Sequence, residues 1–283
     1  MPLRPIVLLL ALSVSTSALA QRAEELRDVM SARAYGMGGA YRALGLGTEA
    51  VLGNPAAMAL FPAYRVEATG AWDVGLKEGL LGISVVDAAT SRLAMGVDYH
   101  WVSLGRGGAR SSAHFSSLGV GLPLNQVILL GATARYLRLS GQSRYVNSVT
   151  VDTGLLLRLS PAFIAGVSAH NLIDTDNEEL TRYFTGHVGV LSGLLTVAGD
   201  VRADLITDDK TTLTYSGGLE YLLGQVLPLR AGYTYDGFAK VSQLSTGLGF
   251  VTQAGGGVDL AYRHDLGGRK GRLLALTLRL QMN

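Results

Sequence analysis

Residues 92–101 read RLAMGVDYHW, and their side chains alternate in character from one position to the next. The large apolar side chains fall on odd positions: Leu93, Met95, Val97, Tyr99 and Trp101. The small or polar side chains fall on even positions: Arg92, Ala94, Gly96, Asp98 and His100. Because successive side chains of a β-strand point to opposite faces, the stretch predicts a strand with one apolar and one polar face.

The same alternation recurs along most of the chain, for example in residues 149–159, 195–205 and 274–281. We count about fourteen such segments, and most are close to the roughly 9–11 residues that a tilted membrane-crossing strand needs. The predicted strands are residues 64–73, 79–87, 91–102, 113–122, 126–138, 146–159, 162–171, 184–193, 195–205, 211–223, 227–236, 241–252, 256–264 and 272–282.

The character of the two faces favours a membrane barrel over a soluble β-sandwich, in which the polar face would be the outer one. The apolar faces carry large aliphatic side chains, and the polar faces combine Gly and Ser with isolated charges, as a crowded lumen would. We therefore predict an all-β protein, a transmembrane antiparallel β-barrel. Aromatic residues near the predicted strand ends resemble an interfacial girdle: Tyr64, Trp72, Trp101, Tyr136, Tyr221, Tyr235 and Tyr262.

The predicted connections alternate in length along the chain. Residues 123–125, 160–161 and 192–193 form tight turns, whereas residues 104–112, 172–182 and 266–271 form longer loops. In outer-membrane barrels the short turns lie in the periplasm and the longer loops lie outside the cell. The pattern therefore also predicts the orientation of the barrel.

The first twenty residues have the features of an export signal. Arg4 supplies a positive charge, residues 6–12 are apolar, and Ala18-Leu19-Ala20 is a small-x-small cleavage site before Gln21. The apolar run is shorter than the roughly 20 residues of a membrane-spanning helix. We expect residues 1–20 to be a signal peptide, residues 21–63 to form an N-terminal segment, and residues 64–283 to form the barrel.

The composition supports this assignment and excludes several classes of protein. Hydrophobic residues make up 48% of the chain and charged residues only 16%, and there are 37 glycines, which suits sheet that faces lipid. The chain has no cysteine, so no disulfide can stabilise it. The formal net charge is only +2 and no block of like charge is present, so we predict no nucleic-acid partner. No nucleotide-binding loop or zinc motif is present, so we expect no cofactor and no metal.

Residues 32–60 read ARAYGMGGAYRALGLGTEAVLGNPAAMAL and contain two motifs, Gly36-Met37-Gly38-Gly39-Ala40 and Asn54-Pro55-Ala56. The glycines permit unusual backbone angles, and Asn54 is placed to cap a short helix over residues 56–60. The stretch resembles the N-terminal signature of the long-chain fatty acid transporter (FadL) superfamily, and within it the PorV/PorQ-like branch. The resemblance implies a barrel of fourteen strands with this partly helical segment folded inside the lumen as a plug, or hatch.

Charges of both signs fall on the predicted inward faces. They are Arg65, Glu67, Asp98, Asp152, Arg158, Asp200, Arg202, Asp204, Glu220, Arg230, Asp259, Arg263 and Arg279. Buried charges need partners, so one interpretation is a network of ion pairs that braces the barrel and the plug. The other interpretation is a polar constriction that selects solutes.

Three further patterns contain residue types that are used in catalysis or cation binding. His114 and Ser116 match the His-x-Ser element of outer-membrane lipid A deacylases, and Asp98 and His100 share a face as an acid–base pair would. Such short matches arise easily by chance, and we predict no enzyme activity. The acidic run Asp174, Asp176, Asn177, Glu178 and Glu179 is predicted to be a solvated outer loop, although its oxygen atoms would also suit Ca²⁺ or the cations that bridge lipopolysaccharide.

Two functions of different class remain open. The superfamily resemblance implies passage of small hydrophobic molecules across the outer membrane, with outer-membrane lipid and lipopolysaccharide as surroundings. The short predicted loops and the PorV-like signature favour instead a plugged, non-conducting barrel that serves a secretion, motility or surface-assembly complex and contacts other envelope proteins.

Overall fold

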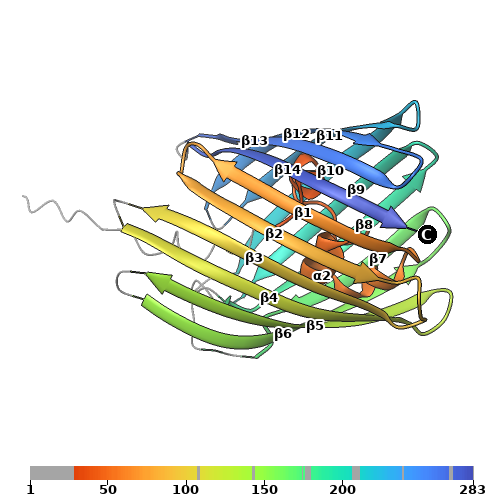
Figure 1. The fold of residues 1–283 in the computed structure, drawn as a ribbon, viewed down its shortest axis with the longest axis horizontal. Coiled ribbons are helices and arrows are strands. Elements are labelled where there is room, and N and C mark those ends of the chain that lie inside the picture. Colours follow the sequence, from red (N-terminus) through yellow and green to blue (C-terminus); the bar gives the residue numbers. More distant parts are fainter. Residues whose placement is uncertain are drawn as a thin grey trace, which may run out of the picture.

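Fourteen antiparallel strands form a closed barrel in the computed structural model (Figure 1). The structure describes residues 29–106, 109–141, 144–173, 175, 180–205, 211–237, 239–267 and 270–282. The predicted signal peptide and the predicted acidic loop lie outside these residues, except for Thr175. Each strand pairs with its sequence neighbours, and β1 closes the barrel by pairing with β14, from Tyr64 opposite Met282 to Asp73 opposite Leu273.

The strand bounds agree closely with the alternation seen in the sequence. The strands are β1 Tyr64–Asp73, β2 Glu78–Asp87, β3 Ala94–Arg106, β4 Ala109–Pro123, β5 Ile128–Gly141, β6 Arg144–Arg158, β7 Phe163–His170, β8 Tyr183–Ser192, β9 Leu195–Asp204, β10 Thr212–Leu223, β11 Leu227–Asp236, β12 Val241–Val251, β13 Gly256–Leu266 and β14 Arg272–Met282.

The outer surface of the barrel is strongly apolar. In β8, for example, buried and exposed residues alternate, and the exposed positions include Phe184, Val188 and Val190. The backbone hydrogen bonds are completed between strands, which is what a bilayer requires of a spanning structure. The prediction of an all-β, closed antiparallel barrel is confirmed. None of the helices that the structure describes is long and apolar enough to cross a membrane.

The predicted loop over residues 104–112 is wrong. β3 continues to Arg106 and β4 begins at Ala109, so the two strands extend as a tall hairpin. In the same way, β5 continues to Gly141 and β6 begins at Arg144. Residues 103–112 are rich in Ser, Gly and Arg and lack the membrane alternation, but each strand still has a hydrogen-bonding neighbour along its whole length. Strand pairing therefore continues beyond the apolar part of the wall.

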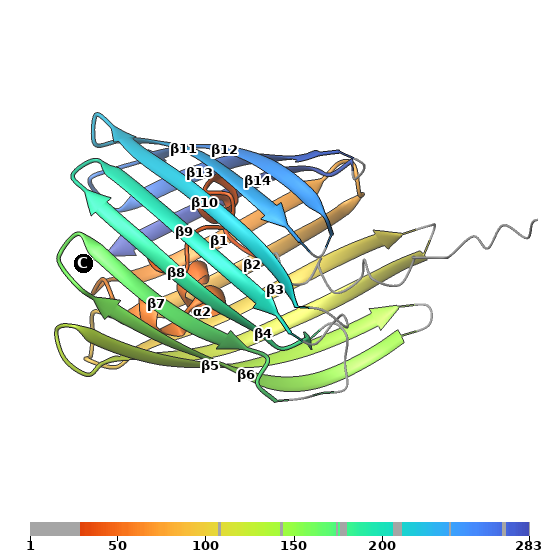
Figure 2. The same cartoon turned by 180° about the vertical axis from the view of Figure 1, so that it is seen from behind.

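Residues 29–63, called here the inner segment, lie inside the barrel (Figures 1 and 2). They contain two short α-helices, α1 (Ala32–Gly36) and α2 (Thr48–Gly53), and the 3-10 helix η2 (Pro55–Ala59). α1 packs against β11–β14, and η2 packs against β3–β6. The segment therefore bridges opposite walls before the chain enters β1.

Candidate functional site

Glycines in the wall allow η2 to approach the sheet closely. Gly121, Gly131 and Gly154 face one another across β4, β5 and β6. A Cβ atom on Gly131 would collide with the backbone of Pro55 and Ala56. A side chain at Gly131 would thus push η2 away from the wall, which explains why this inward position carries none.

A second glycine contact lies on the opposite wall. Gly218 and Gly232 are paired across β10 and β11, and the backbone of Met37 and Gly38 rests on them. Gly38 has a φ of 63°, in the left-handed region that glycine adopts without strain. The Gly36–Ala40 motif therefore places a tight backbone turn directly against the sheet.

Asn54 begins η2 as predicted. Its side-chain oxygen accepts a hydrogen bond from the Ala56 amide at 3.1 Å, and Pro55 occupies the first helical position. The Asn54 Nδ2 atom lies 2.7 Å from Nε2 of His187 on β8. Asn54 is fully buried. It therefore both caps the helix and ties the inner segment to the barrel.

A chain of alternating charges links the inner segment to the wall. Arg33 in α1 lies between two carboxylates, 2.7 Å from Glu49 and 3.2 Å from Glu220. Glu220 is also 2.5 Å from Arg230, which is 2.6 Å from Asp259. The members in order are Glu49, Arg33, Glu220, Arg230, Asp259 and Arg279.

Each carboxylate in this chain has a cationic partner, which satisfies the requirement for buried charges. Burial by itself lowers the pKa of the Arg33 guanidinium, but Glu220 and Glu49 more than offset this and raise it above its ordinary value. Arg33 therefore remains charged. The network is consistent with the predicted bracing of barrel and inner segment.

Two more ion pairs anchor the rest of the lumen. Arg42 of the inner segment lies 3.1 Å from Asp200 on β9, and Asp200 also accepts hydrogen bonds from the backbone amides of Tyr41 and Arg42. Arg135 on β5 lies 2.5 Å from Asp152 on β6 and donates to the Leu52 carbonyl. The first pair holds the turn at Tyr41 and Arg42 in place, and the second contacts the end of α2.

The outer half of the lumen has an apolar side that runs across neighbouring strands. One inward residue from each of β13, β14 and β1–β6 lies opposite the next. We call this set the apolar row, and it consists of Ala261, Ala275, Ala71, Leu80, Val102, Ala113, Leu139 and Val146. All but Val146 are buried, and Val146 is partly buried against the same cluster.

The apolar row climbs toward the outer end, which we define as the end away from the C-terminus. Ala261 lies five residues from Gly256, where β13 begins at the C-terminal end. Val146 lies twelve residues from Arg158, where β6 ends at that same end. The difference corresponds to about 23 Å along the strands. The row is therefore a continuous apolar ramp from the middle of the barrel to its outer end.

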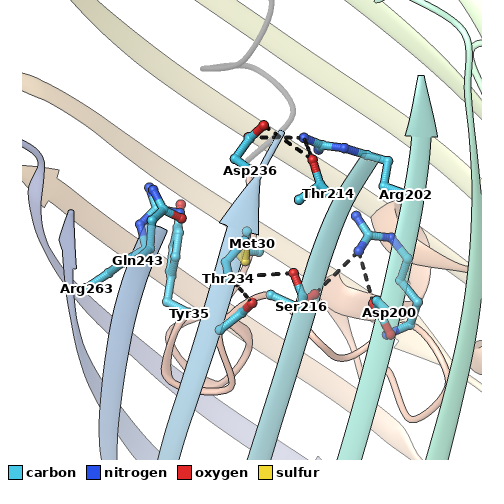
Figure 3. Close-up of a pocket in the computed structure, with 13 residues that line it drawn as sticks. Met30, Tyr35, Asp200, Arg202, Thr214, Ser216, Thr234, Asp236, Gln243 and Arg263 are labelled. Carbon is cyan, nitrogen blue, oxygen red and sulfur yellow. Dashed lines mark hydrogen bonds and ion pairs between the residues drawn. The ribbon is translucent and has the colours of Figure 1, made fainter. Parts of the chain in front are cut away.

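The opposite side of the outer lumen is polar, as Figure 3 shows. A pocket of about 30 Å³ lies there between the inner segment and β9–β13. Arg202 donates to Asp236 at 3.5 Å and to Thr214 at 3.4 Å. The Arg263 guanidinium lies over the Tyr35 ring, 5.2 Å from its centroid. The outer lumen is thus two-faced: most charges lie on β9–β13 and the apolar row runs from β13 through β14 to β6, with Asp73 on β1 and Glu78 on β2 at its outer edge.

The inner segment covers the apolar row. Val29, Met30 and Tyr35 belong to the same buried cluster as Leu80 and Val102. A cavity of about 50 Å³ remains between Tyr35 and the wall, lined by Leu80, Val102, Leu104 and Leu273 and also by the charged residues Asp73, Glu78 and Arg263. The described lumen therefore contains a partly apolar site, bordered by charged residues, that the chain itself largely fills.

The predicted site residues lie where the alternation places them. Each predicted lumenal charge falls on the inward face of its strand and is buried or half-buried. Asp98 and His100 also face inward, with His100 Nδ1 2.8 Å from Asp98 Oδ1. His114 and Ser116 instead face outward, and His114 Nδ1 is 2.8 Å from the Tyr99 hydroxyl.

The inner-segment partners of the charge network and the apolar row were not predicted from the sequence. Arg33, Arg42 and Glu49 were detectable as the isolated charges within an otherwise small and apolar stretch. The apolar row had a subtler signal. In residues 112–116 the apolar side chains, Ala113 and Phe115, are at the positions that face inward, and the polar side chains are at the positions that face outward. This is the inverse of the pattern in the membrane region.

The structure thus defines a membrane-spanning β-barrel with an internal N-terminal segment and a two-faced lumen. No family model and no curated protein sequence matches the chain. No group of three His, Asp or Glu side chains that could hold a metal ion is present among the residues described above.

Three solved structures illustrate the proteins that share this fold. A CymD monoaromatic hydrocarbon channel superposes with a TM-score of 0.69 at 14% sequence identity, over 88% of this chain and 96% of CymD. The toluene transporter TodX of P. putida gives 0.69 at 12% identity, over 90% and 98%. A FadL homologue from Pseudomonas aeruginosa gives 0.69 at 12% identity, over 89% and 98%. This chain shares the fold of these proteins.

Proposed function

We propose that the protein is an outer-membrane channel for small hydrophobic molecules. The observation that carries the proposal is the apolar row, because aliphatic side chains facing a lumen have no role in a water-filled pore. Transfer of an apolar molecule from water onto such a surface is favourable in proportion to the apolar area that is buried. The ramp leads from the outer end to the centre of the barrel.

The solved structures support the chemical class. CymD is described as a monoaromatic hydrocarbon channel and TodX as a toluene transporter, and both have this fold over nearly the whole chain. We infer a substrate of similar size and polarity for this protein. Export through the predicted signal peptide would deliver the chain to the outer membrane.

Movement of the inner segment is part of the proposal. A cavity of about 150 Å³ lined by aliphatic side chains holds benzene in other proteins. The lumenal cavities described here measure only about 50 and 30 Å³. A ligand would therefore have to displace Val29 or Met30 from the apolar row before it could enter.

A second function, as the non-conducting partner of an envelope assembly, is favoured by the same small cavities. The charge network and both glycine contacts hold the inner segment against opposite walls. The predicted resemblance to the PorV/PorQ-like branch agrees with this alternative. A sealed barrel that co-purifies with envelope proteins and passes no reporter would establish it.

Uptake of a hydrophobic fluorescent dye tests the channel. The outer membrane of Gram-negative cells limits the entry of N-phenylnaphthylamine. Cells that express the protein should therefore become fluorescent faster than cells with an empty vector. Leu139→Gln places an amide near the outer end of the apolar row, and an unsatisfied polar group there costs about 1–3 kcal/mol. We expect about a tenfold slower uptake.

The matched control is Leu139→Met, which keeps an apolar side chain of similar volume and should retain uptake. Equal expression and heat-modifiable gel mobility of both variants would show that each barrel folds. Uptake by Leu139→Gln cells at the wild-type rate would contradict a role for the apolar row.

A further inference from the structure

Very few charged side chains point outward from the strands. Among the strand side chains that the structure describes, these are Asp87, Arg138 and Arg272. Asp87 lies at the C-terminal end and accepts hydrogen bonds from the Ala89 and Thr90 amides of its own turn. Arg138 and Arg272 lie toward the outer end, and neither guanidinium has a hydrogen bond, ion pair or ring contact with another described residue.

Both arginines stand beside the same arrangement of side chains. Arg138 lies directly opposite His114 across β5 and β4, and Arg272 lies directly opposite His264 across β14 and β13. Side chains in such pairs have Cβ atoms about 4.5–5.5 Å apart. The arrangement therefore occurs twice, on separate parts of the wall.

In each case a tyrosine fixes the histidine ring. The Tyr99 hydroxyl lies 2.8 Å from His114 Nδ1, and the Tyr262 hydroxyl lies 3.2 Å from His264 Nδ1. If the tyrosine hydroxyl donates to Nδ1, the neutral ring carries its proton on Nε2. Each site then presents an N–H group of histidine next to the N–H groups of an arginine.

The two sites lie at the outer boundary of the apolar wall. His114 is opposite the exposed Trp101, and one step further out the outward residues are Ser103, Ser112 and Ser140. Arg272 is the first residue of β14, and the exposed Tyr262 lies below it on β13. Tyr and Trp gather where lipid tails meet headgroups. An unpaired arginine there costs little, whereas at mid-depth it would cost about 2–4 kcal/mol.

We propose that each Tyr–His–Arg site, formed by Tyr99, His114 and Arg138 or by Tyr262, His264 and Arg272, binds the phosphate of an outer-leaflet lipid. Arginine pairs with phosphate oxygen atoms through two parallel N–H groups, and the histidine N–H supplies a further donor. The exposed aromatic and aliphatic residues on the lipid side of each site would contact the acyl chains. This binding does not depend on what the lumen carries.

Native mass spectrometry of the full-length, delipidated protein tests the proposal. After incubation with phosphatidylglycerol, the wild-type protein should retain two tightly held lipids, and Arg138→Gln or Arg272→Gln should retain one. The double variant should retain none. Lys240→Gln is the matched control, because it removes a positive charge from an exposed turn at the outer end without touching either site.

Two further probes decide which chemistry is recognised. Diacylglycerol, which lacks the phosphate, should not be retained, and millimolar inorganic phosphate should not displace phosphatidylglycerol, because acyl-chain contacts contribute to the complex. Displacement by inorganic phosphate would show a simple anion site and overturn the lipid assignment. Equal retention of phosphatidylglycerol by the double variant and the wild type would overturn the sites themselves.

Discussion

Single glycines determine how closely the inner segment approaches the wall. Gly131 lies beneath Pro55 and Ala56, where even one methyl group has no space, whereas a Cβ atom on Gly186 of β8 would meet nothing within 4 Å. Both residues are glycines within strands, so the sequence alone does not distinguish them. Their surroundings predict opposite responses to the same substitution.

Gly131→Ala should loosen the inner segment, because the added methyl group forces the backbone of η2 away from β5. Overpacking of this kind typically destabilises by about 1–3 kcal/mol. The expected result is faster proteolysis of residues 29–63 in the folded, detergent-solubilised protein. Gly186→Ala serves as the control and should leave the proteolysis rate unchanged. The same rate for both variants would contradict the contact at Gly131.

Arg33→Met should be among the more damaging substitutions in the inner segment. It removes the cation that lies between the Glu49 and Glu220 carboxylates. Removing one partner of a buried ion pair costs about 3–5 kcal/mol. Urea unfolding of the protein refolded into lipid vesicles would measure the loss. Adding Glu220→Gln should recover about 0.5–3 kcal/mol, since contacting residues are coupled by that amount. Purely additive effects would mean that Arg33 does not act through Glu220.

At the scale of elements, the barrel and the inner segment are held together in different ways. The strands pair with one another by backbone hydrogen bonds around the full circle. The inner segment is attached by side chains: ion pairs, an Asn–His hydrogen bond and packing on glycines. The segment is therefore the part that can move while the wall stays intact.

Deletion of residues 36–59 should leave the barrel folded and open its lumen. The deletion removes α2, η2 and the turn after α1, but no residue that pairs in the sheet. In planar bilayers the deleted protein should show large, stable ion-conducting steps, whereas the intact protein should be nearly silent. Identical conductance of the two proteins would mean that the inner segment does not block the lumen.

At the scale of the whole molecule, the wall is divided by depth. In the membrane region large apolar side chains face outward and polar ones face inward. In the outer parts of β3, β4 and β5 the order reverses, so that Ala113 and Leu139 face inward while Ser112 and Arg138 face outward. The reversal marks the height at which the outer surface passes from lipid to water.

Depth should therefore decide the effect of an outward arginine. Leu276→Arg, at mid-strand in β14, should destabilise the protein by about 2–4 kcal/mol in lipid vesicles, whereas Ser112→Arg, above Trp101, should cost about 0–1 kcal/mol. Reversible urea unfolding of both variants would compare them. Equal losses would place the membrane boundary elsewhere on the wall.

The alternation of side chains was enough to predict the barrel, the bounds of most strands and the inward face of each charge, because a period of two is imposed locally by strand geometry. Asn54 as a helix cap was predictable for the same reason, since capping joins residues that are close in sequence. The partners of the charges were not predictable from the sequence, because Arg33 and Glu220 are far apart along the chain and only the closed barrel brings them together. The apolar row, the covering of that row by Val29 and Met30, and the two Tyr–His–Arg sites each join residues from different strands, so only the register of the closed sheet could bring them together.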